Sequence, residues 1–260
     1  MTKALGDQFV IFTTTLYRED AVSAVRSVLA KRFLENAGKL GIRCVVVDGG
    51  SNPDFLIFLK SLPHVTLLED PTLGMGEGRR AALNKALEFP VPYFLWSEPE
   101  KDGLITQENL SRLLKEFQDK KVDVIVPKRE SMESLPKFQR QMESRANQRA
   151  ARLLNTDKIL DLWFGPKAMN REGAKYFTDY KGKLDKWDAI IKPVLDAYRD
   201  GKRVASVPID YTYDPSQSRS EEHDRAMKLK RLEQYTQILA ELGDTFSHEK
   251  LMDRGVPQLR

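Results

Sequence analysis

The chain has 260 residues, 41% of them hydrophobic, which suffices for one large α/β domain or two small ones. No apolar run approaches the roughly 18–20 residues that a transmembrane helix needs, and the N-terminus lacks the apolar core of a signal peptide. The 42 Lys and Arg residues are interleaved with 38 Asp and Glu, so the net charge of +4 does not indicate a nucleic-acid partner. A single cysteine excludes an internal disulfide and suits a reducing compartment, so we expect a cytoplasmic protein without a transmembrane anchor.

Strand and helix patterns alternate along the first half of the chain. Short apolar or β-branched runs predict the strands, and apolar residues at helical spacing predict the helices. The expected strands are 8–15, 43–47, 65–68, 93–97 and 122–126, and the expected helices are 19–40, 53–60, 78–88 and 107–120. This alternation predicts an α/β fold with a doubly wound, mostly parallel sheet flanked by helices.

The pattern loosens after Pro127. The expected elements there are helices over 135–154, 186–199 and 222–242, an extended segment over 159–165, and a strand followed by a loop over 204–213. No internal repeat or linker interrupts the chain, so we expect one domain over residues 1–260.

An acidic residue ends the second expected strand. Asp48 is followed by Gly49 and Gly50, and ligands of doubly wound sheets bind at the carboxyl ends of the strands. The carboxylate can accept a hydrogen bond from the uracil imide N–H or the guanine amino group, and the glycines let the backbone approach a flat base. An equally good interpretation is a strand-to-helix turn that Asp48 caps.

A glycine-rich basic segment opens the helix after the third expected strand. Gly74, Gly76 and Gly78 precede Arg79 and Arg80. Backbone N–H groups at such a helix N-terminus favour anions, and arginine adds bidentate contacts to a phosphate. The segment lacks the ending of a P-loop, and a flexible surface loop is the alternative.

Two glutamates follow the fourth expected strand. Glu98 and Glu100 are separated by Pro99, which stiffens the turn. Two carboxylates at a strand end can bind a hard divalent cation that bridges phosphate oxygens. A solvated acidic turn is the alternative.

Taken together, residues 45–51, 74–87 and 93–102 resemble glycosyltransferases of the GT-A fold, especially the family-2-like group. The resemblance implies that the acid after the second strand contacts the base of a nucleotide sugar. It also implies that the glycine-rich basic segment covers the diphosphate or the sugar. Glu98–Glu100 stand where the family has a D-x-D motif that binds Mg²⁺ or Mn²⁺. The residues placed in the donor site are Thr13, Thr15, Asp48, Gly76, Arg79, Arg80 and Glu98.

The resemblance continues through residues 123–130, 161–177 and 185–211. It implies that Asp188, or secondly Asp185, is the acid of the catalytic region. That acid would deprotonate the acceptor hydroxyl in an inverting enzyme, or bind sugar hydroxyls in a retaining one. A helix cap is the alternative.

Two further residues have a functional and a structural interpretation. His223 lies where such enzymes can place a third metal ligand, beside Glu98 and Glu100, or it is an exposed histidine at a helix start. Trp163 can stack on an acceptor or pack in the core.

The sequence therefore predicts a glycosyltransferase, and a hexosyltransferase within that class. It would move a sugar from a nucleoside-diphosphate sugar to a hydroxyl of a small-molecule, glycan or lipid-linked acceptor, with Mg²⁺ or Mn²⁺. Residues 8–126 would bind the donor, residues 127–225 would bind the acceptor and catalyse, and residues 226–260 would form a C-terminal helix and tail. A sugar nucleotidyltransferase and a non-catalytic nucleotide-sugar-binding protein stay open as alternatives.

Overall fold

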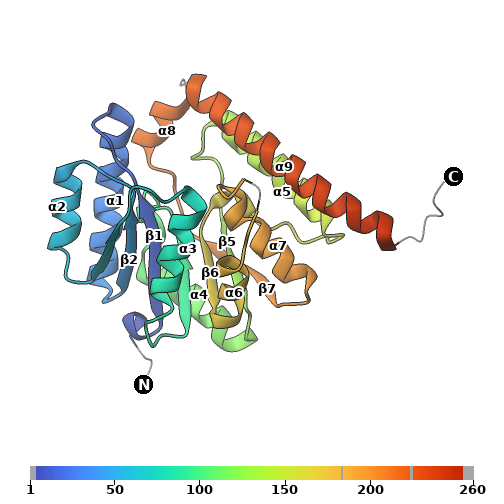
Figure 1. Cartoon of the computed structure of the whole chain (residues 1–260), viewed down its shortest axis with the longest axis horizontal. Coiled ribbons are helices and arrows are strands. Elements are labelled where there is room, and N and C mark those ends of the chain that lie inside the picture. The colour runs from blue at the N-terminus through green and yellow to red at the C-terminus, as the bar shows by residue number, and fades with distance from the viewer. Residues whose placement is uncertain (1–3, 183, 223–224, 254–260) are drawn as a thin grey trace.

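Seven strands form one sheet in the computed structural model, which describes residues 4–182, 184–222 and 225–253 (Figure 1). The strands are β1 (Phe9–Thr15), β2 (Arg43–Asp48), β3 (Val65–Glu69), β4 (Tyr93–Trp96), β5 (Val124–Arg129), β6 (Lys167–Asn170) and β7 (Val204–Ile209). Their order in the sheet is β3-β2-β1-β4-β6-β5-β7. Strand β6 is antiparallel to both of its neighbours, and every other pair is parallel. The predicted α/β fold with a mostly parallel sheet is confirmed.

Helices cover both faces of the sheet. They are α1 (Ala21–Lys39), α2 (Pro53–Ser61), α3 (Met75–Ala86), α4 (Gln107–Lys120), α5 (Lys137–Leu153), α6 (Arg171–Thr178), α7 (Lys192–Arg199), α8 (Pro215–Glu222) and α9 (Arg225–Asp253). Among the described residues, no helix combines the length and the apolar character that crossing a bilayer requires.

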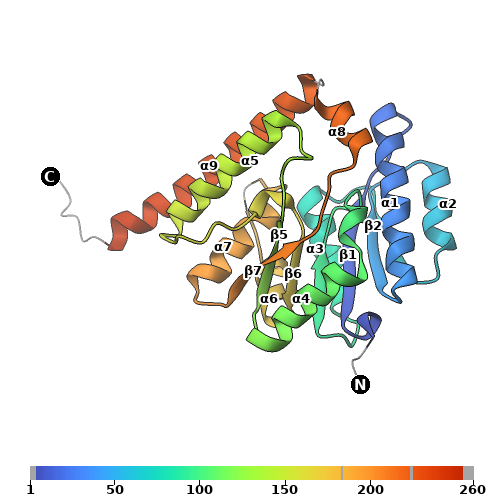
Figure 2. The ribbon, with the colours of Figure 1, turned by 180° about the vertical axis from the view of Figure 1, so that it is seen from behind.

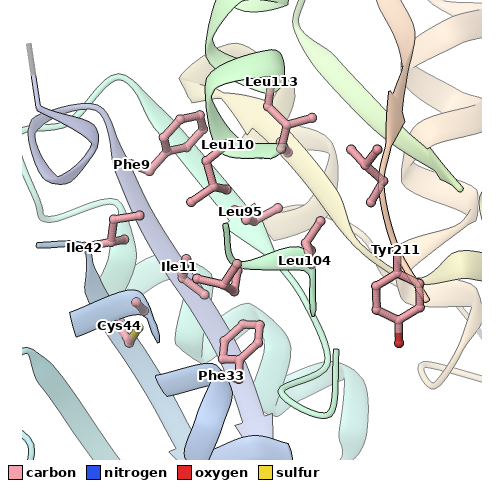
Figure 3. Packing of buried hydrophobic residues seen from close by; sticks show 14 of the residues in the cluster. Phe9, Ile11, Phe33, Ile42, Cys44, Leu95, Leu104, Leu110, Leu113 and Tyr211 are labelled. Carbon is pink, nitrogen blue, oxygen red and sulfur yellow. The ribbon is translucent and has the colours of Figure 1, made fainter. Parts of the chain in front are cut away.

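Alternate residues of each strand enter two separate cores, because successive side chains of a strand point to opposite faces. Phe9, Ile11 and Cys44 pack against α1, α2 and α4 in the first core, part of which is shown in Figure 3. Val10 and Phe12 pack against α3, α6 and α7 in the second. The complete burial of Cys44 raises the pKa of its thiol to about 12, as expected of a packing residue.

The last two helices lie beyond the carboxyl ends of the strands. In both views α8 and α9 run along the side of the molecule at which β1 ends, with α9 alongside α5 (Figures 1 and 2). Residues of α9 and of the strand ends together line a cavity in this region.

The structure differs from the predicted elements in the second half of the chain. Strand β6 was not predicted, because four residues are too few to give a periodic pattern. Residues 162–164 form a 3-10 turn within the segment expected to be extended. The helix expected over 186–199 begins only at Lys192, because Pro193 fits the first turn of a helix and not its interior. Helix α8 lies before the expected final helix, where no helix was predicted, and α9 extends beyond the expected end at residue 242 to Asp253.

Candidate functional site

A cavity of about 230 Å³ lies between the carboxyl edge of the sheet and α9. Its walls come from the end of β1, from α1 and α3, from the segment after β4, and from the turn before β6. Helix α9 closes it. The residues used below that line it are Thr14, Arg26, Arg79, Trp96, Glu98, Glu100, Lys101, Arg129, Trp163, Phe164, Trp187, Lys230 and Arg231. Of the predicted site residues, the fold thus brings Arg79, Glu98 and Glu100 to one cavity.

Polar groups without partners are concentrated in this cavity. Seven buried side-chain nitrogen or oxygen atoms have no hydrogen-bond partner within the described residues, and six of them belong to residues that line it. The six are the Nε atoms of Arg26, Arg79 and Arg231, the indole nitrogens of Trp96 and Trp163, and Glu98 Oε2. Each such group costs about 1–3 kcal/mol when left unpaired. The set consists of five N–H donors and one carboxylate oxygen, a combination that a polar, largely anionic ligand would satisfy.

Asp48 ends β2 and is saturated by hydrogen bonds from its own protein. Its carboxylate is 1% exposed and accepts bonds from Thr15 Oγ1 (2.6 Å), Gly50 N (2.9 Å), Ser51 N (2.7 Å) and Ser51 Oγ (2.6 Å). Four donors use the lone pairs that two carboxylate oxygens offer. In this arrangement Asp48 fixes the loop after β2, and its contact with a base stays a prediction.

Strand parity decides which threonine of β1 reaches the cavity. Thr13 donates its hydroxyl to Ser97 O at 2.7 Å, and Thr15 donates to Asp48, so both are used inside the protein. Thr14, between them, lines the cavity. The alternation of side chains along β1 could have predicted the position of Thr14, because Thr14 shares a face with Val10 and Phe12, which pack against α3.

The glycine-rich start of α3 is joined to residues 185–186. Gly76 N donates to Asp185 O at 2.9 Å, and Arg80 Nη2 donates to Asp185 Oδ2 at 2.7 Å. A Cβ at Gly76 would lie 2.1 Å from Asp185 Oδ1 and 2.5 Å from Asp185 O, so only glycine permits this approach. Asp185 itself adopts a left-handed backbone with φ of 46°. Arg80 and Asp185, predicted for different roles, are therefore partners.

Arg79 extends from α3 into the floor of the cavity. Its guanidinium lies 5.0 Å from the centre of the Trp96 ring and donates to Lys186 O through Nη1. Burial lowers the pKa of Arg79 to about 10, although Glu98, Asp188 and Asp185 attract its charge. The side chain thus keeps a full positive charge at neutral pH in a desolvated place, where it attracts an anion strongly.

Asp188 is enclosed by its own loop. Its carboxylate is 2% exposed and accepts hydrogen bonds from Tyr180 Oη (2.5 Å), Lys186 N (2.8 Å) and Asp185 N (3.2 Å). It does not line the cavity, whereas its neighbour Trp187 does. This geometry is that of a residue that shapes the turn, and the predicted catalytic role stays untested.

Glu98 and Glu100 face the cavity at the end of β4. Glu98 lies against Gly165, where a Cβ would be 2.3 Å from Oε2, and Lys101 Nζ is 3.9 Å from the same oxygen. Glu100 Oε1 accepts a hydrogen bond from Tyr17 Oη at 3.0 Å. Both glutamates therefore retain acceptor capacity toward the cavity.

No cluster of three or more His, Cys, Asp or Glu side chains suited to a metal ion occurs within the described ranges. His223, predicted as a third metal ligand, lies outside the described residues. Within the cavity, Glu98 and Glu100 are thus the predicted protein ligands that the structure brings together.

Several cationic residues of the site were not singled out in the sequence. Lys167 is fully buried behind the cavity and donates to the carbonyl oxygens of Leu162, Gly165 and Pro166 at 2.9–3.2 Å. Burial lowers its pKa to about 7, against the attraction of Glu98 and Asp161. Arg129 is held by Asp161 and Glu143, and it lines the cavity beside Phe164. Charged residues on helices and strands give no sequence signal that separates such positions from a solvated face.

The sequence matches the model of Glycosyl transferase family 2 over residues 10–177. No curated protein matches it. Among solved structures the chain is similar to glucosyl-3-phosphoglycerate synthase from Mycobacterium tuberculosis in complex with Mn²⁺, uridine diphosphate and phosphoglyceric acid. That comparison has a TM-score of 0.61 and 12% identity, and covers 93% of this chain and 79% of that chain.

A second similar structure is CMP:2-keto-3-deoxy-manno-octonic acid synthetase complexed with CTP. Its TM-score is 0.53 at 8% identity, covering 87% of this chain and 99% of that chain. At these identities the structures show a shared fold, whereas the family match extends over more than half of the chain. The resemblance inferred from the three sequence segments is confirmed: the chain belongs to glycosyl transferase family 2.

Proposed function

We propose that the protein transfers a sugar, and specifically a hexose, from a nucleoside-diphosphate sugar to an acceptor hydroxyl. The observation that carries the proposal is the set of six unpartnered polar atoms around one cavity at the carboxyl edge of the sheet. A diphosphate sugar supplies many acceptor oxygens for five N–H donors. The similar synthase structure contains uridine diphosphate and Mn²⁺, which supports the same ligand class.

Arg79 is proposed to stabilise the leaving group. When the glycosidic bond to the donor breaks, negative charge grows on the nucleoside diphosphate. Arg79 is already charged, desolvated and held by Trp96 and Lys186, so it needs no reorganisation to meet that charge. Arg80 is paired with Asp185 and is proposed to act indirectly. It would fix residues 185–186, and the carbonyl oxygen of Lys186 accepts a hydrogen bond from Arg79.

Glu98 and Glu100 are proposed to hold a divalent cation, Mg²⁺ or Mn²⁺. The fit is supported by Glu98 Oε2, a buried carboxylate oxygen without a partner, and by a second carboxylate two residues later in the same cavity. Bound there, the ion would supply Lewis-acid neutralisation of the diphosphate. Glu98 lies near Lys101 and Glu100 near Arg26, so these side chains would share the balancing of charge.

Asp48 and Asp188 are proposed to act through the loops that they hold. Asp48 shapes the turn after β2, which lies at the predicted place of the base. Asp188 shapes the turn on which Trp187 faces the cavity. Trp163, with an unpartnered indole nitrogen, is proposed to contact the acceptor.

A thermal-shift screen tests the proposal. UDP-, GDP- and dTDP-sugars would be added with and without Mg²⁺ or Mn²⁺. A ligand at 100 times its dissociation constant adds about 2.7 kcal/mol to the free energy of unfolding. We expect one nucleotide to raise the melting temperature clearly, and its sugar to be released or transferred in a metal-dependent manner. Absence of both effects with all three nucleotides would overturn the proposal.

A further inference from the structure

The outer end of the cavity holds a group of cations that the donor-site motifs do not include. Arg26 comes from α1, and Lys230 and Arg231 come from α9. Helices α1 and α9 are about 200 residues apart in the chain. A hydrogen bond from Arg26 to Glu221, at the end of α8, joins the two regions. The fold of α8 and α9 across the sheet edge brings them together (Figure 1).

Glu221 is the carboxylate around which this group is arranged. It is 5% exposed, lies 3.1 Å from Arg26 Nη2 and 3.7 Å from Arg231 Nη2, and accepts a bond from Tyr213 Oη at 3.1 Å. Glu100 is the second carboxylate whose charge acts on Arg26. Three cations and two carboxylates therefore lie at this end of the cavity, which leaves one positive charge in excess.

Unused hydrogen-bond donors accompany the excess charge. The Nε atoms of Arg26 and Arg231 are both buried and both without a partner in the part of the chain that the structure describes. Desolvation, with repulsion from Arg26 and Arg231, lowers the pKa of Lys230, which agrees with a crowded group of like charges. Two free N–H donors beside an ammonium group have the chemistry that recognises a phosphoryl group.

We infer that Arg26, Lys230 and Arg231 form an anion subsite at the α1–α9 end of the cavity, which binds a phosphoryl group of a substrate. The inference rests on the proposed function and deepens it, since the phosphoryl group has two possible sources. It belongs either to the diphosphate of the donor or to a phosphorylated acceptor. Arg79 serves the floor of the same cavity and is not part of this subsite.

The experiment uses the full chain and two variants in which shorter, neutral and polar glutamine replaces the cations. Lys230→Gln and the double variant Lys230→Gln/Arg231→Gln remove one and two charges from α9. Arg225→Gln is the matched control, because Arg225 is an exposed arginine on the same helix that does not line the cavity. The probes are inorganic phosphate, inorganic pyrophosphate, and the nucleoside diphosphate selected by the thermal-shift screen, each measured by calorimetric titration.

We expect the double variant to bind phosphate or pyrophosphate about tenfold or more weakly than the wild type, the loss expected for charge-assisted hydrogen bonds, and the control to bind as the wild type does. Phosphate that binds alongside a saturating nucleoside diphosphate would identify an acceptor subsite. Phosphate that is displaced, with a matching loss of nucleoside-diphosphate affinity in the double variant, would identify the donor diphosphate.

Equal affinities for all probes in the wild type and the double variant would overturn the inference. So would a lower melting temperature with unchanged affinities, which would show that the cations only fasten α9 to α1. These outcomes are distinct from failure of the proposed function. In that case no nucleotide sugar binds, whereas phosphate binding and its loss in the double variant persist.

Discussion

The four acidic residues predicted for the site fall into two pairs that differ in how many hydrogen bonds their carboxylates accept from the protein. Asp48 and Asp188 are saturated by hydroxyl and backbone donors of their own loops. Glu98 and Glu100 face the cavity, and Glu98 keeps one buried oxygen without a partner. A carboxylate whose lone pairs are filled by the protein shapes the site, and one with an unfilled lone pair is available to a ligand. The following variants test this distinction.

The largest effect is expected for Glu98→Gln. Glutamine keeps the size of the side chain and removes the charge that attracts a hard cation. We expect turnover of the nucleotide sugar to fall by about 10²–10³-fold, the range for loss of one preorganised electrostatic contact, with little change in melting temperature. Glu108→Gln, on the exposed side of α4, is the control. High activity of the Glu98 variant, or of the wild type in EDTA, would contradict the assignment.

Asp188→Asn separates a catalytic from a positioning role. An amide cannot accept all three hydrogen bonds, so we expect a loss of roughly 1–3 kcal/mol in the free energy of unfolding and a turnover reduced less than tenfold. A general base would instead lose about 10²–10⁴-fold in turnover at nearly unchanged stability. Tyr180→Phe removes one of the same donors and should lose part of the same stability. Urea unfolding and steady-state kinetics on both variants decide between the roles.

Gly76→Ala tests the contact between α3 and residues 185–186. The added Cβ would meet the backbone oxygen of Asp185 at 2.5 Å, which cannot move without breaking its bond to Gly76 N. We expect a loss of roughly 1–3 kcal/mol in stability and weaker donor binding. Gly243→Ala, in α9, meets no atom of the described residues within 4 Å and should be neutral or stabilising by up to about 1 kcal/mol. Equal effects of the two substitutions would refute the tight approach.

Lys167 gives the most specific signal, a dependence of stability on pH. Its folded pKa of about 7 lies below the roughly 10.4 of an unfolded lysine, so the unfolded state binds more protons between these values. Stability contributed by this group therefore rises with pH across that window, by at most about 1.4 kcal/mol per pH unit. Lys167→Met should remove that slope. Parallel stability curves for the wild type and Lys167→Met between pH 7 and 10 would show that the ammonium stays charged on its three carbonyl oxygens.

Most elements of residues 8–126 could be predicted because each of them carries its own local signal. The apolar run before Asp48 and the glycines before Arg79 specify a strand end and a helix start without reference to the rest of the chain. The predicted end of β4 also placed Glu98 and Glu100 at the carboxyl edge of the sheet, where both line the cavity.

The remaining features depend on partners that are distant in sequence. The saturation of Asp48 by Thr15, and of Asp188 by Tyr180, depends on tertiary contacts that no local pattern encodes. In the sequence, Lys230 and Arg231 have the pattern of a solvated helix face. Only the tertiary position of α9 shows that both line the cavity. Strand β6 is specified by its pairing with β4 and β5 and not by its four residues.

The direction of β6 has a practical consequence for engineering. Because the strand starts where β4 ends, at the Lys167–Trp96 pair, the chain between α5 and β6 must pass over the carboxyl edge before it enters the sheet. This passage places Trp163 at the cavity, on a segment that is separate in the chain from β1, β2 and β3. Asp161 in this segment pairs with the buried Arg129, and Leu162 O just after it accepts a hydrogen bond from Lys167, so sequence changes here must keep these two residues and are open at exposed positions such as Ile159.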